Sequence, residues 1–159
     1  MAEKSLKDLF TEAMLAALDE TFERVYGMYL DRGTSLFETL ATITAAEASI
    51  PVSANCASIA AHVEHMRFYM DITLRYIRGE RPQVDWGEIW RTVREVSPEA
   101  WMDSQQRLRE TYAEIRALVT STETWEGEDE IGAALALLMH NAYHLGEIRQ
   151  ALCTLKPDR

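Results

Sequence analysis

Apolar side chains recur at helical spacing in four long segments of the chain. In the first, about residues 4 to 26, they repeat with a period near 3.6 residues, at Leu6, Leu9, Phe10, Met14, Leu15, Leu18, Phe22 and Val25. Similar segments cover about 58–78, 97–120 and 129–155. Alternating β-branched runs closed by Asn-Gly or Asp-Gly turns, which are typical of strands, do not occur. The pattern therefore predicts an all-α protein.

Residues typical of helix ends bound these segments. Ser58 is a suitable N-cap for the second long helix, and Gly79 follows its last turn. Ser97 followed by Pro98 is typical of a helix start, and opens the third. A break is expected near Gly27 to Thr34, a helical turn at 35–43, a loop at 49–55, and a short helix or ordered lid at 85–96. We predict a four-helix bundle with short additional helices in the connections, forming one domain over residues 1–159.

The charge of the chain disfavours two classes of partner. The formal net charge is −10, and the Lys and Arg residues form no basic patch, so binding to nucleic acid or to anionic membranes is not expected. The N-terminal segment lacks the apolar core of a signal peptide, and no run of 18 apolar residues occurs. We therefore expect a cytoplasmic protein whose two cysteines, Cys56 and Cys153, are reduced and buried.

The histidines are the main chemical clue. All four lie in two short segments, as His62 with His65 and as His140 with His144. Residues three or four apart share one side of a helix, so two such helices packed together would bring the imidazoles into one small volume. Neutral imidazole is a common ligand of zinc, nickel and other late first-row divalent ions. This predicts a metal site with three or four protein ligands, and three would leave a coordination position open.

The neighbours of the histidines on the last helix suggest further roles. Glu147 lies three residues beyond His144, where it can be a ligand, accept an imidazole N–H, take a proton from bound water, or be an ordinary surface charge. Small residues share this face, at Ala133, Ala136 and Ala151, and leave space beside the rings. Tyr69 follows His65 by four residues, a position typical of a packed boundary. HExxH, GxSxG and Gly-rich phosphate motifs are absent, which excludes the corresponding enzyme classes.

The sequence does not decide how a second apolar face of the last helix packs. Leu135, Leu138 and Leu145 lie away from the histidines, so this face either packs inside the bundle or is shared with a second subunit in a homodimer.

Two segments carry a family resemblance. HNAYHLGEIRQAL (140–152) resembles the fourth-helix signature of the DinB/YfiT-like metalloenzyme family, and SIAAHVEHMRF (58–68) resembles its second-helix segment. TSLFETL (34–40) and the stretch DWGEIW (85–90) are weaker similarities. The resemblance implies a bundle with a variant of up-and-down topology, often dimeric, and a metal held by His65, His140 and His144. His62 departs from the family pattern. It is either an extra ligand or a residue that contacts the ligands without binding the metal.

The resemblance also implies a chemistry. Characterised relatives are transferases and isomerases that activate a low-molecular-weight thiol, such as bacillithiol or mycothiol, for reaction with a small-molecule substrate. In this context Glu147 is expected to act in proton transfer or to orient a histidine, and Tyr69 and Arg149 to lie near the cavity or its rim. The alternative function is a metal- or ligand-binding bundle without turnover, because a fold alone does not carry an activity.

Overall fold

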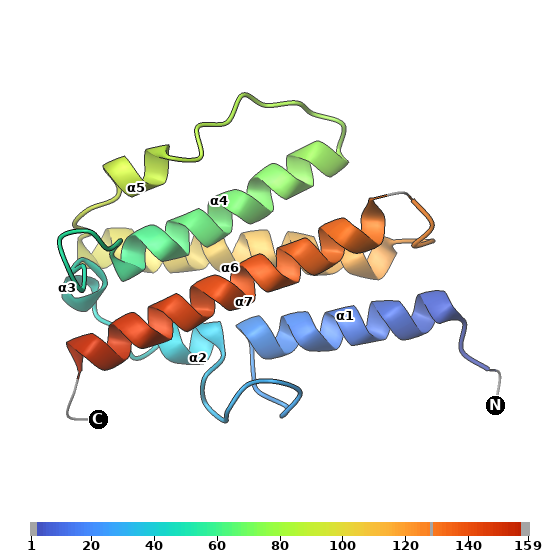
Figure 1. Cartoon of the computed structure of the whole chain (residues 1–159), viewed down its shortest axis with the longest axis horizontal. Helices are drawn as coiled ribbons and strands as arrows, with labels where there is room; N and C mark the ends of the chain where they lie inside the picture. Colours follow the sequence, from blue (N-terminus) through green and yellow to red (C-terminus); the bar gives the residue numbers. More distant parts are fainter. Residues whose placement is uncertain (1–2, 128, 157–159) are drawn as a thin grey trace.

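Four long helices form a bundle in the computed structural model of the protein, which describes residues 3–127 and 129–156 (Figure 1). The long helices are α1 (Leu6–Phe22), α4 (Ile59–Ile77), α6 (Pro98–Ser121) and α7 (Glu130–Leu155). Three short helices lie in the connections, namely α2 (Leu36–Leu40), α3 (Ala45–Ala48) and α5 (Glu88–Thr92). All regular structure in the described residues is helical, which confirms the predicted fold class.

Side-chain caps fix where the site-bearing helices begin and end. The Ser58 hydroxyl accepts the N–H of Ala61 at 3.2 Å and begins α4. Ser97 caps α6 in the same way, with Pro98 in its first turn as expected. Gly79 follows α4 with a φ of 85°, a conformation that glycine adopts without steric cost. The predicted ends of α4 and α6 agree with the structure to within about one or two residues.

The first helix is shorter than expected. It ends at Phe22 and not near residue 26, because the buried Glu20 carboxylate binds the chain that follows. Its two oxygens accept four backbone N–H groups at 2.6–2.9 Å, from Tyr26, Met28, Tyr29 and Leu30. These donors cannot also continue a helix, so residues 23–34 form an irregular connection to α2.

Consecutive long helices of the bundle do not always run in opposite directions. In Figure 1, α1 and α7 run the same way, and α4 and α6 run together in the opposite direction. Each of α4 and α1 contacts both α6 and α7. Because α4 and α6 are parallel neighbours, the connection between them must return along the outside of the bundle, and it carries α5 back to the first half of α4. This crossover places α5 in contact with α4.

The core is continuous between the helices. Phe22 stacks on Tyr112 with ring centroids 4.4 Å apart, which joins α1 to α6. The Trp101 indole N–H donates to the carbonyl of Ile43 at 2.9 Å and ties α6 to the connection after α2. Within the described residues, each helix is too short or too polar to cross a membrane.

Candidate metal centre

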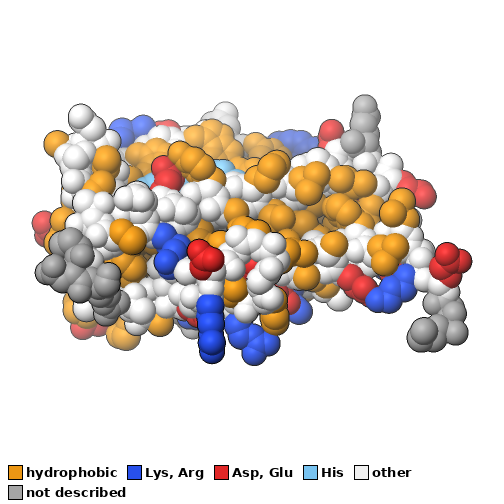
Figure 2. Space-filling view, turned by 60° about the horizontal axis from the view of Figure 1, so that its bottom comes forward, with side chains coloured by type: hydrophobic (Ala, Val, Ile, Leu, Met, Phe, Trp, Pro, Cys, Tyr) orange, Lys and Arg blue, Asp and Glu red, His pale blue; other side chains and the backbone are white. Residues whose placement is uncertain are grey.

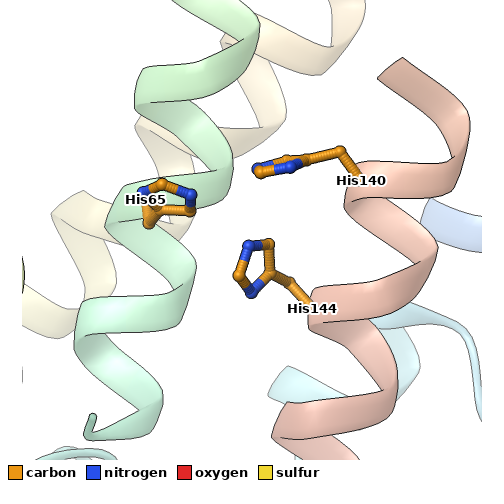
Figure 3. A group of neighbouring side chains, drawn as sticks. All are labelled: His65, His140 and His144. Atoms are coloured by element: carbon orange, nitrogen blue, oxygen red, sulfur yellow. The ribbon is translucent and has the colours of Figure 1, made fainter. Parts of the chain in front are cut away.

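Three of the predicted ligands come together between α4 and α7. Each of His65, His140 and His144 offers a ring nitrogen, and these three atoms all lie within 4.8 Å of one another. His65 projects from α4 toward the other two, which α7 presents one turn apart (Figure 3). Two opposed helices therefore hold three imidazoles around one point.

Two of these rings carry nitrogens with no hydrogen-bond partner. His65 Nδ1 and His140 Nε2 are buried and have no hydrogen-bond partner in the described part of the chain. A buried polar atom without a partner costs about 1–3 kcal/mol, so native proteins normally satisfy such atoms. A metal ion bound to imidazole nitrogen is one way to satisfy them, and three neutral nitrogens suit a zinc-like ion.

The surroundings keep the imidazoles neutral. Burial lowers the pKa of His65 to about 4, with further lowering by the neighbouring rings of His144 and His140. Burial and then His144 lower the pKa of His140 to about 4 as well. Burial also lowers the pKa of His144, although the nearby Glu147 carboxylate opposes it. Neutral rings have lone pairs available for a metal at neutral pH.

Aromatic side chains enclose the cluster. Tyr69 on α4 stacks on His140 with centroids 3.7 Å apart and ring planes 16° from parallel. Trp90 on α5 lies over His65 at 4.3 Å and also contacts His62 and His144. Tyr69 therefore contacts the histidine cluster but, like Arg149, is not among the residues that line the adjacent cavity, and α5 covers the rings.

A second group of donors lies beside the first and shares His144 with it. His62 Nδ1 is 3.1 Å from His144 Nδ1, and Glu147 Oε2 is 2.7 Å from His144 Nδ1 and 3.4 Å from His62 Nδ1. Burial lowers the pKa of His62, although Glu147 opposes it. Glu147 is thus in direct contact with the imidazole cluster.

A cavity of about 890 Å³ opens on this second group. Its lining includes His62, His144 and Glu147 together with Trp90 and Arg94. A space of this size accommodates a small organic ligand.

Other sequence expectations differ from the structure. Arg149 donates to Thr39 Oγ1 on α2 at 3.1 Å, and it is not among the residues that line this cavity. Of the three alanines expected beside the histidines, only Ala151 lines the cavity, while Ala133 is exposed. The expectation of buried cysteines is wrong, because Cys56 and Cys153 are both exposed free thiols, and Cys56 lies on the cavity wall.

Sequence reasoning did not assign Trp90 to the site. The segment around it was expected to be a short helix or lid, but its place over the histidines depends on the path of residues 78–97 across the bundle. The two tryptophans in the short stretch DWGEIW, between two long helices, were the available signal.

The fold and the histidine cluster together define a helical-bundle protein with a candidate metal centre. The sequence pattern of the DinB superfamily matches residues 29–148, which is most of the chain. The protein therefore belongs to the DinB superfamily. Searches of curated proteins and of solved structures each found no match.

Proposed function

We propose that the protein binds a divalent transition metal ion, zinc or nickel, through His65, His140 and His144 and uses it in thiol-dependent transfer or isomerisation of a small molecule. The observation that carries the proposal is a pair of buried ring nitrogens without hydrogen-bond partners in the described residues, one from His65 on α4 and one from His140 on α7, in a cluster that His144 on α7 completes. Three protein ligands leave room for a further ligand, as in catalytic zinc sites. A bound metal would supply a lowered thiol pKa and hence a nucleophilic thiolate at neutral pH.

The residues around the cluster have roles that suit this chemistry. Glu147 lies against His144 Nδ1, where a carboxylate keeps the ring turned with its other nitrogen toward His65 and His140. The same carboxylate lies at the cavity, within reach of a proton released by a substrate. Trp90 lies over His65 and limits the access of water to this ring.

The metal site is tested first, by competition for zinc against a chromophoric chelator at one equivalent of metal. His140→Asn removes one ligand with a similar volume, and we expect a loss of affinity of at least 100-fold. The matched control is His62→Asn, which alters the adjacent group and leaves the three ligands in place. Wild-type affinity in His140→Asn would contradict the proposed ligand set.

Turnover is tested next with the metal-loaded protein. Low-molecular-weight thiols are combined with chlorinated aromatic electrophiles, and product formation is followed by absorbance. We expect turnover that disappears in His140→Asn. Stoichiometric metal uptake with no turnover for any thiol would support the alternative, a metal-binding bundle without catalysis.

We also propose a homodimer formed through α1 and α7. Figure 2 shows hydrophobic side chains gathered on the face that these helices form. Leu9 on α1 is 51% exposed, and Leu135 and Met139 on α7 are 42% and 61% exposed, whereas Leu145 belongs to the core. A contiguous apolar surface of this kind on a bundle is typical of an interface.

Sedimentation velocity tests the dimer. Leu135→Glu should convert the protein to a monomer, because it places a charge at a partly exposed apolar position on α7. Met102→Glu, at an exposed position on α6, is the matched control and should leave the dimer intact. A wild-type protein that is monomeric at high micromolar concentration would exclude the interface.

Two exposed free thiols suit a reducing compartment, and we propose that the protein is located in the cytoplasm.

A further inference from the structure

The group formed by His62, His144 and Glu147 has the geometry of a second cation site. Metal–ligand bonds of about 2.0–2.2 Å in tetrahedral or octahedral geometry place neighbouring ligand atoms roughly 2.8–3.6 Å apart. The three donor atoms here are separated by 2.7, 3.1 and 3.4 Å. Their spacing is therefore already close to that of ligands around one ion.

One of the three atoms in this group has no hydrogen-bond partner within the described part of the chain. Glu147 Oε2 is buried and has no hydrogen-bond partner in the described residues, although two ring nitrogens lie beside it. His62 and His144 approach each other through like atoms, Nδ1 against Nδ1, so at most one of the two can donate to the other. A cation among the three atoms would give the unpartnered Glu147 oxygen a ligand bond and would replace the single imidazole–imidazole hydrogen bond with two more.

The group is distinct from the three-histidine cluster. His62 and Glu147 take no part in that cluster, and His144 joins the two with different atoms. One nitrogen of the His144 ring points between His65 and His140, and the other points away from them (Figure 3). It is this second nitrogen, Nδ1, that faces His62 and Glu147.

We propose that His62, His144 and Glu147 hold a second divalent transition metal ion, so that one chain binds two ions joined by the His144 ring. The second ion replaces the ring proton of His144, which passes to solvent, so this site binds more weakly than the first. All three of its ligands line the cavity, whereas the first group contributes only His144 to the lining. A small molecule bound in the cavity would therefore contact the second ion.

The proposal is tested with Cu²⁺, by equilibrium dialysis and electron paramagnetic resonance. The experiment uses a Cys56→Ser, Cys153→Ser background, because exposed thiols bind and reduce copper. We expect two ions in the parent protein, and one in each of His62→Asn and His140→Asn. Two copper ions joined by one imidazole couple magnetically, so the parent loses signal intensity when the second ion binds, and His62→Asn shows one isolated ion at full intensity.

Two outcomes would overturn the second site. The first is a single ion in the parent that His62→Asn retains and His140→Asn loses, which would leave the three-histidine site intact. The second is two ions in His62→Asn, which would place the second ion elsewhere. Glu147→Gln provides an independent variant should His62→Asn not fold, and it should weaken the second ion at least tenfold, and by more than it weakens the first, because Glu147 is a ligand of the second ion and only orients a ligand of the first.

Discussion

The lowered pKa values of the ligands predict that zinc affinity resists acid. An imidazole with the ordinary pKa of about 6.5 is only about 9% neutral at pH 5.5 and about 76% neutral at pH 7, so two such ligands would weaken binding about 70-fold between these pH values. His65 and His140 have pKa values of about 4 in the folded protein. Each is then about 97% neutral at pH 5.5, and the loss of affinity from these two residues is less than about 10%.

The assay is competition for zinc with a chelator whose own protonation is calibrated at each pH. We expect nearly constant affinity from pH 7 to about pH 5.5 and a steep fall near pH 4, where both rings take up protons. Circular dichroism at each pH establishes that the bundle stays folded. A fall of about 70-fold between pH 7 and pH 5.5 in folded protein would show that burial does not protect the ligands, and it would refute the reasoning.

Three further predictions rest on other contacts. Metal-free protein should lose stability as the pH falls from about 6.5 toward 4, because the unfolded chain binds protons at His65 and His140 before the folded chain does. A thermal denaturation midpoint that stays constant across this pH range would contradict the prediction. Binding of Cu²⁺ should quench tryptophan fluorescence, and Trp90→Phe should remove most of the quenching, since this ring lies 4.3 Å from His65; unchanged quenching would place α5 elsewhere. Although burial opposes ionisation of Glu20, four backbone N–H groups lower its pKa to about 2. Glu20→Gln should therefore cost about 3 kcal/mol, seen as a midpoint lowered by roughly 10 °C, and a change under about 2 °C would show that these hydrogen bonds matter little.

Local sequence signals predicted most of the helices. Ser58, Gly79 and the Ser97–Pro98 pair act through hydrogen bonds and backbone conformation within a few residues, so their effects can be recognised in the sequence. The end of α1 could not be predicted in this way. It depends on Glu20 binding residues up to ten positions further along the chain, and nothing local distinguishes that carboxylate from a surface one.

The candidate site was predictable to the extent that it lies on helix faces. His65, His140 and His144 share faces of two helices that must pack, and the structure brings them together. The positions of Trp90 and of the hydrogen-bond partner of Arg149 could not be predicted, because they depend on how distant connections cross the bundle. Trp90 reaches the histidines through the crossover, and Arg149 meets Thr39 from α2, a contact between residues 110 positions apart.

The crossover between α4 and α6 can open the site to solvent without unfolding the bundle. Residues 78–97 leave α4 at one end and rejoin the bundle at the other, and Ile89 is the only fully buried residue of α5. Detaching this segment exposes little apolar surface compared with parting the long helices, so it needs only a local opening. Exchange of ions and ligands can then proceed at the rate of that opening, far faster than global unfolding, and amide hydrogen exchange in α5 should outpace that in α4 and α7.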